Sequence, residues 1–228
     1  MDATLQAELT AFLGGYITEH KKQLMEQVLA QRTRFITVAL EDIYQPQNAS
    51  AVVRTADCFG IQDIHIIEGR NQYNINPQVV RGSEKWVNLI KYHGQENNTA
   101  TCFTALRQKG YTLVGTSPHR QGVALPDLQP DRPMALVFGT EETGLSDYAL
   151  EQVDIHLRIP MYGFTESFNL SVSAAICLYQ LTTRLRQSGI DYLLSEEEKA
   201  ALRLQWYRRV VRRSAVLEEE FLKNKQAK

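Results

Sequence analysis

Short β-branched apolar runs alternate with helical patterns through the middle of the chain. Apolar runs of this length, bounded by turn residues, predict buried strands. The predicted strands are residues 35–40, 63–67, 111–116, 134–138 and 154–159. The predicted helices are residues 48–59, 100–108, 146–152 and 169–187. Because alternating strands and helices require crossover connections, we expect an α/β domain over residues 34–188, with a mainly parallel sheet covered by helices on both faces.

Helical patterns also flank this domain. Residues 1–33 predict two helical pieces. Near the carboxyl end, Ser195 and Glu198 match a capping box, which predicts that a helix begins there. An apolar stripe continues across residues 206–221 and is typical of an amphipathic helix. The pattern therefore predicts a helical extension before the domain and a second one over residues 189–228.

The composition is that of an ordinary globular protein, with 43% hydrophobic and 22% charged residues. Charged residues interrupt the apolar runs before they reach the length of a membrane span, and no secretory signal is expected at the amino terminus. The three cysteines, Cys58, Cys102 and Cys177, are an odd number without paired spacing. We therefore expect reduced cysteines, no metal site and a cytoplasmic protein.

The charge pattern gives mixed evidence about a nucleic-acid partner. The net charge of −1 differs from the positive excess that is usual in nucleic-acid-binding proteins. Phosphate is bound by local charge, however, and four arginines lie within six residues near the carboxyl end: Arg208, Arg209, Arg212 and Arg213. These arginines either bind RNA phosphates or form a solvated helix face, and the sequence leaves both interpretations open.

Three blocks along the chain combine polar residues with apolar runs. The first is Asn48–Ala56, in the helix predicted after the first strand. Asn48 is either a helix cap or a catalytic residue. Arg54 lies among alanine and valine residues, so we expect its side chain to be largely buried, which is costly for an unpaired guanidinium. Asp57 could pair with Arg54 and supply a purely structural explanation.

The second and third blocks follow predicted strands, where open α/β sheets place their ligands. Phe138–Gly144 has glycines near both ends, which permit a sharp turn or a close approach to a ligand. It matches neither a Walker A motif nor a dinucleotide fingerprint. Ile159–Ser171 contains a glycine loop with two aromatic residues, and lining a flat organic ligand accounts for this composition. An ordinary turn, and a helix cap at Ser167 or Asn169, are the structural alternatives.

In order and spacing, the three blocks resemble the signature motifs of the TrmH-type branch of the SPOUT superfamily, the RNA ribose 2'-O-methyltransferases. The stretch Arg81–Val87 is similar to a further segment of that family. The resemblance implies a trefoil knot in the carboxyl-terminal third of the α/β domain, with S-adenosylmethionine bound in it. It also implies an obligate homodimer whose sites are completed at the interface. The cofactor contacts that it implies are Thr116, Gly139, Ile159, Met161 and Phe168.

The same resemblance gives Arg54 the central catalytic role. Because arginine is almost never deprotonated in a protein, we expect Arg54 to stay charged. It would hold the phosphate next to the ribose and stabilise the alkoxide that forms as the 2'-hydroxyl loses its proton. Asn48 and Ser167 would orient Arg54 and the ribose. Asn169 would fix the loop, and Glu141 would anchor Arg54 or the loop backbone.

Basic side chains outside these motifs would capture the RNA. The candidates are Lys21, Lys22, Arg32, Arg34, Arg208, Arg209, Arg212 and Arg213. The resemblance implies a tRNA substrate, methylated at guanosine 18 in the D-loop. Ribosomal RNA and the tRNA wobble nucleotide are alternatives within the same chemistry. A non-catalytic RNA-binding dimer is the alternative from another class.

Overall fold

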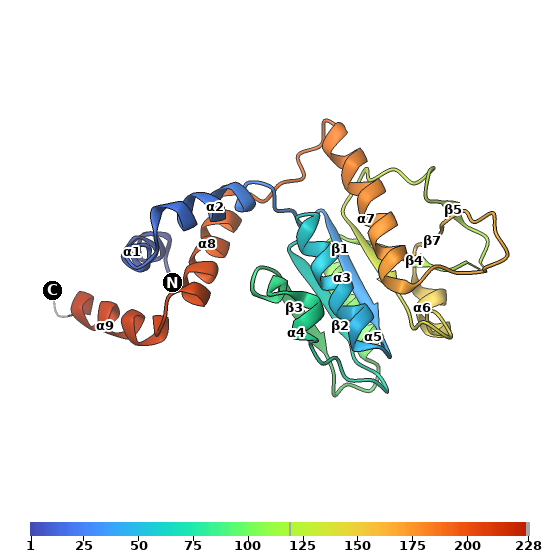
Figure 1. The fold of residues 1–228 in the computed structure, drawn as a ribbon, viewed down its shortest axis with the longest axis horizontal. Coiled ribbons are helices and arrows are strands. Elements are labelled where there is room, and N and C mark those ends of the chain that lie inside the picture. The colour runs from blue at the N-terminus through green and yellow to red at the C-terminus, as the bar shows by residue number, and fades with distance from the viewer. Residues whose placement is uncertain (119, 227–228) are drawn as a thin grey trace. The chain divides into compact units, whose positions relative to one another are not determined.

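The computed structural model describes residues 1–118 and 120–226 (Figure 1). The chain divides into two compact units. The sheet unit comprises Thr33–Tyr192, and the terminal unit combines Met1–Arg32 with Leu193–Lys228. Both predicted helical extensions therefore contribute to the same unit.

A seven-stranded parallel sheet forms the centre of the sheet unit. Its strands are β1 (Ile36–Glu41), β2 (Asp63–Ile67), β3 (Asn88–Tyr92), β4 (Thr112–Thr116), β5 (Val123–Ala124), β6 (Met134–Phe138) and β7 (Ile155–Arg158). The strand order is β3-β2-β1-β6-β4-β7-β5, so β6 is inserted between β1 and β4. The prediction of an α/β fold with a mainly parallel sheet is confirmed.

Two strands, β3 and β5, were outside the predicted set, and both lie at edges of the sheet. The side chains of β3 are mostly half-buried and include Asn88 and Lys91, so this strand lacks the continuous apolar run of a central strand. β5 pairs with β7 alone, and its two residues are too few to show a periodic pattern. Edge position explains both omissions.

Helices cover both faces of the sheet, as predicted. They are α3 (Pro46–Cys58), α4 (Pro77–Val80), the 3-10 helix η1 (Ser83–Lys85), α5 (Asn98–Gln108), α6 (Asp147–Gln152) and α7 (Leu170–Gln187). Helices α3 and α7 pack against each other and against Ile36, Val38 and Leu40 of β1 (Figure 1). Helices α5 and α6 pack on the other face, in a second core that includes Ala39 of β1. Successive side chains of a strand point to opposite faces, so one strand supplies both cores.

The starts of α3 and α7 settle two of the helix-cap alternatives. Helix α3 begins at Pro46 with Gln45 as its N-cap, because proline has no N–H to lose at the first helical position. Asn48 therefore lies inside the helix, and the prediction that the helix begins at Asn48 is wrong. Asn169 is the N-cap of α7 and accepts a hydrogen bond from Ser171 N at 2.9 Å.

The terminal unit is helical. Its helices are α1 (Ala3–Gly14), α2 (Glu19–Leu29), α8 (Glu196–Val210) and α9 (Ser214–Gln226). The capping box predicted at Ser195 and Glu198 is confirmed, with both reciprocal hydrogen bonds formed. Trp206 is fully buried, and the guanidinium of Arg32 lies 5.4 Å from the centre of its ring. In the described part of the chain, no helix combines the length and the apolar content needed to cross a bilayer.

The carboxyl-terminal stripe spans two helices, and the interpretation of a single amphipathic helix is wrong. Helix α8 ends at Val210, and Arg213 adopts a left-handed conformation with φ of 55° before α9 begins. The hydroxyl of Ser214 donates to the carbonyl of Arg208 at 2.7 Å, which stabilises the turn. Since no glycine or proline marks this turn, helical periodicity alone could not locate it.

Candidate active site

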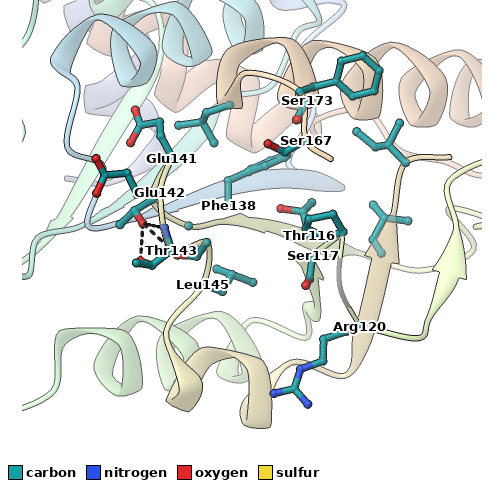
Figure 2. Close-up of a pocket in the computed structure, with 18 of the residues that line it drawn as sticks. Thr116, Ser117, Arg120, Phe138, Glu141, Glu142, Thr143, Leu145, Ser167 and Ser173 are labelled. Carbon is teal, nitrogen blue, oxygen red and sulfur yellow. Dashed lines mark hydrogen bonds between the residues drawn. The ribbon is translucent and has the colours of Figure 1, made fainter. Parts of the chain in front are cut away.

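A pocket of about 320 Å³ opens at the carboxyl ends of β4, β6 and β7 (Figure 2). Its walls come from the loops that follow these three strands and from the start of α7. All five predicted cofactor contacts line it: Thr116, Gly139, Ile159, Met161 and Phe168. The pocket therefore brings together residues from loops that are distant in the sequence.

The turn after β6 depends on glycine. A Cβ atom added to Gly139 would lie 2.1 Å from the carbonyl carbon of Gly144, so no side chain fits there. Gly144 has a φ of 71°, a conformation that glycine adopts without strain. Thr140 and Gly144 exchange two backbone hydrogen bonds of 2.9 and 3.0 Å, which close the turn. The two glycines thus explain the form of the second block.

The pocket wall combines two kinds of surface. Phe138, Leu145 and Leu157 give it an apolar side. Ser117 and Ser173 add hydroxyl groups, and the turn at Gly139 brings backbone close to the cavity. An apolar wall with a few polar groups suits a ligand that has a flat ring and a polar tail. S-adenosylmethionine, which carries an adenine ring and an amino acid, has this character.

Three polar residues, one from each block, are hydrogen-bonded beside the pocket. Asn48 Nδ2 donates to Glu141 Oε1 at 2.7 Å, and Asn169 Nδ2 donates to Asn48 Oδ1 at 3.1 Å. The other Glu141 oxygen, Oε2, is buried without a hydrogen-bond partner in the described part of the chain. Because Asn48 is held from both sides, its side chain has a fixed orientation. Glu141 anchors Asn48, whereas the sequence predicted an anchor for Arg54 or the loop backbone.

Arg54 is exposed, and the prediction of a buried guanidinium is wrong. Within residues 1–118 and 120–226 it has no hydrogen-bond or ion-pair partner, so pairing with Asp57 does not explain it either. The buried positions of α3 include Ala49, Val52, Val53 and Ala56, which form a regular helical stripe that excludes position 54. Arg54 also does not line the pocket of its own chain.

The pocket also has polar residues that were absent from the predicted site, among them Ser117, Arg120, Glu142 and Ser173. Ser117 directly follows β4 and Arg120 lies three residues further on. The end of a parallel strand is the sequence signal that could have found them. Ser167, which was predicted, lines the pocket and is exposed. In Figure 2 the carboxylates of Glu141 and Glu142 point away from Thr116 and Ser117.

A buried carboxylate holds the segment that follows the glycine turn. Glu41 is 5% exposed and accepts hydrogen bonds from Thr99 Oγ1 at 2.7 Å, Ser146 N at 2.9 Å and Ser146 Oγ at 2.8 Å. Glu41 is the last residue of β1, and Ser146 is the N-cap of α6. The carboxylate therefore ties the end of β1 to the segment that follows the pocket-forming turn.

Replacing Glu41 by alanine is expected to lower the free energy of unfolding by about 2–4 kcal/mol, because three donors would lose their charged acceptor. Urea denaturation measures this change. The matched control is Glu151→Ala on the exposed side of α6, for which we expect a change below about 0.5 kcal/mol. Equal stabilities for the two variants would contradict the anchoring role of Glu41.

The predicted RNA contacts differ in accessibility. Arg32 is 1% exposed and stacks over Trp206, so its guanidinium cannot reach a phosphate and this prediction is corrected. Arg34 forms an ion pair with Asp63 at 2.9 Å. In the terminal unit, Lys22 lies 3.5 Å from Glu19 and Arg208 is bound by Glu218. The candidates that remain well exposed are Lys21, Arg209, Arg212 and Arg213.

Comparisons with known proteins agree with this geometry. Residues 35–179 match the SpoU rRNA Methylase family. The tRNA (guanosine(18)-2'-O)-methyltransferase of Borreliella burgdorferi is 46% identical over 206 residues, which cover 90% of this chain and 93% of that protein. The crystal structure of the A. aeolicus TrmH/SpoU tRNA modifying enzyme has 28% identity and a TM-score of 0.76, covering 86% of this chain and 98% of that one. The SpoU methyltransferase AviRb from Streptomyces viridochromogenes, in complex with AdoMet, has 26% identity and a TM-score of 0.57, covering 72% and 62%.

The chain has a parallel α/β sheet with a pocket at its carboxyl edge, and its fold is similar to that of a methyltransferase solved in complex with AdoMet. Together with the family match, these features define a methyltransferase that uses S-adenosylmethionine. The chain belongs to the SpoU methylase family. The predicted family and methyl donor are therefore confirmed.

Proposed function

We propose that this enzyme transfers the methyl group of S-adenosylmethionine to the ribose 2'-hydroxyl of guanosine 18 in the D-loop of tRNA. The observation that carries the reaction type is the bonded set Asn48, Glu141 and Asn169 beside the cofactor pocket. The tRNA nucleotide is supported by the B. burgdorferi relative, a tRNA (guanosine(18)-2'-O)-methyltransferase whose similarity covers 90% of this chain. Ribosomal RNA and the wobble nucleotide are the competing substrates.

The cofactor supplies a methyl group on a positively charged sulfur, and the protein must align the ribose oxygen with it. Asn48, fixed by Glu141 and Asn169, offers a rigid amide beside the pocket. Ser167, which lines the pocket and is exposed, would contact the ribose. Arg54 stays charged, holds the neighbouring phosphate and stabilises the oxygen as its proton leaves. The proton passes to the phosphate or to water.

A homodimer would bring Arg54 to a reaction centre. Arg54 is exposed and absent from the pocket of its own chain, so in this proposal it serves the pocket of a second copy. Helix α7 offers a surface for that copy, because Val172 and Tyr179 are 44% and 62% exposed. The rings of Tyr179 and Phe59 pack 6.3 Å apart, which joins this surface to the end of the helix that carries Arg54.

The strand order supports a knotted carboxyl-terminal third. After β4, the chain returns as β6 on one side of that strand and then as β7 on the other side. The loops after β6 and β7 then meet the loop after β4 around one pocket. We include in the proposal that these crossings form the trefoil knot that the family resemblance implies.

The exposed arginines of the terminal unit are proposed to hold tRNA phosphates. Arg212 and Arg213 are exposed and have no ion pair within the described residues. Replacing both by alanine is expected to reduce the slope of log affinity against log salt by about 2, since each phosphate contact contributes about 0.9 for duplex nucleic acid. Filter binding of tRNA between low and moderate salt measures the slope. An unchanged slope would show that these side chains are only a solvated surface.

Incubation of the protein with labelled S-adenosylmethionine and total tRNA or ribosomal RNA tests the proposed substrate. We expect label in tRNA, and mapping should place a 2'-O-methyl group at guanosine 18. Label in ribosomal RNA or at the wobble nucleotide would assign a different substrate. Calorimetry with the cofactor adds an independent check, because a non-catalytic RNA-binding dimer need not bind it. A tRNA substrate is also what would place the enzyme in the cytoplasm.

A further inference from the structure

A second cleft, of about 990 Å³, lies at the carboxyl ends of β1 and β2. The loops after these strands form it, together with the start of α5 and residues 140–144. Residues 140–144 also line the cofactor pocket, so the two cavities share one wall. A ligand in this cleft would lie next to a bound cofactor.

Several polar side chains of the cleft already have structural roles. The carboxylate of Glu41 binds Thr99 and Ser146. Asp42 Oδ1 accepts from the backbone N–H groups of residues 69 and 71, at 3.1 and 2.7 Å. Glu68 binds Lys91 at 2.9 Å. These three carboxylates are committed to the fold and do not need a ligand.

Three other residues of the cleft have no such role. Tyr44 is 67% exposed, so its ring is accessible to a ligand in the cleft. Arg70 and Glu142 are exposed, and neither has a hydrogen-bond or ion-pair partner in the described ranges 1–118 and 120–226. On the shared wall, the buried oxygen of Glu141 is also unsatisfied within those ranges. The cleft thus offers an aromatic ring, a free cation and a free carboxylate.

This combination suits a nucleotide better than a metal ion. Aromatic rings stack on bases, and arginine binds phosphate. A carboxylate can accept two parallel hydrogen bonds from adjacent donors. Guanine presents such a pair, its N1–H and its 2-amino group, whereas adenine has no donor at N1. Within the described residues, no group of three or more histidine, cysteine or acidic side chains could hold a metal.

We propose that this cleft binds the guanine base of the nucleotide that is methylated, with Tyr44 stacked on the base and Glu142 accepting from N1–H and the 2-amino group. Arg70 would bind a phosphate of the same strand. The base must leave its stack to enter the cleft, as is usual when enzymes act on a buried nucleotide. This inference rests on the proposed function and adds the origin of its base preference.

The test compares tRNA carrying guanosine with tRNA carrying inosine at the methylated position, at saturating cofactor. Inosine keeps N1–H but lacks the 2-amino group. For the unmodified enzyme, we expect kcat/KM to be about tenfold higher with guanosine, since one hydrogen bond to a charged group is lost with inosine. For Glu142→Gln the ratio should fall to about 1–2. The matched control, Glu151→Gln on the exposed side of α6, should keep the ratio of the unmodified enzyme.

Stacking is tested separately with Tyr44. Tyr44→Ala should lower kcat/KM by about 5- to 100-fold with both substrates, and Tyr44→Phe should restore most of it, because either ring can stack. An unchanged guanosine-to-inosine ratio in Glu142→Gln would overturn the proposal. An equal rise in kcat/KM with both substrates, caused by the loss of charge repulsion, would overturn it as well. So would full activity of Tyr44→Ala. Absence of tRNA methylation by the unmodified enzyme would instead refute the proposed function.

Discussion

Replacing Arg54 by alanine is expected to abolish methyl transfer while leaving the affinity for S-adenosylmethionine nearly unchanged. The guanidinium is exposed and does not line the pocket, so cofactor binding does not depend on it. Its loss removes the charge that would stabilise the developing alkoxide, an effect of about 10²–10³-fold or more in kcat. Single-turnover methylation and cofactor calorimetry measure the two quantities. A variant that keeps most of its turnover would refute the catalytic role of Arg54.

Complementation shows which copy of Arg54 serves a given pocket. One protomer carries Arg54→Ala with an intact pocket, and the other carries Arg54 with a pocket disabled at Gly139. If Arg54 acts across a dimer interface, the mixed dimer has one complete site and regains activity. If Arg54 acts within its own chain, the mixture stays inactive, because neither protomer holds both parts.

The second large effect is expected for Gly139→Ala. The added Cβ atom would lie 2.1 Å from backbone atoms of Gly144, so the turn that forms the pocket wall must shift. We expect loss of measurable cofactor binding, together with a decrease of about 1–3 kcal/mol in the free energy of unfolding from overpacking. Calorimetry with S-adenosylmethionine and urea denaturation test both parts.

Gly189→Ala is the matched control for this substitution. A Cβ atom at Gly189 meets nothing within 4 Å, and the residue lies beyond the end of α7. This variant should bind cofactor and unfold like the unmodified protein. If Gly139→Ala also binds cofactor normally, the close approach at Gly139 is not what shapes the pocket.

The sequence located the central strands well because they are short apolar runs that are buried on both faces. β2 and β6 were predicted with their observed ends, since each is fully buried. The edge strand β3 was not predicted, because its half-exposed side chains give a weaker pattern. The five cofactor contacts were carried over from the resemblance to the three blocks, and all of them line one pocket. Periodicity could not have shown that their loops meet.

Arg54 illustrates the opposite case. Its surroundings in the sequence suggested burial, yet α3 buries only one stripe, which includes Val52, Val53 and Ala56. With about 3.6 residues per turn, position 54 lies outside the arc that holds positions 52, 53 and 56, so an arginine among valines can still face outward. The stripe was readable in the sequence, and the prediction failed because it considered composition rather than helical spacing.

By itself, the amino-acid sequence determined the alternation of strands and helices, the three polar blocks and the family that they resemble. Those features are local, since they depend on side-chain spacing within single elements. Only the tertiary structure decided that Asn48, Glu141 and Asn169, which lie up to 121 residues apart, form one hydrogen-bonded set. It also decided that β6 inserts between β1 and β4 and that a second cleft shares a wall with the cofactor pocket. Strand order and long-range contacts follow from how whole elements pack, which no local pattern encodes.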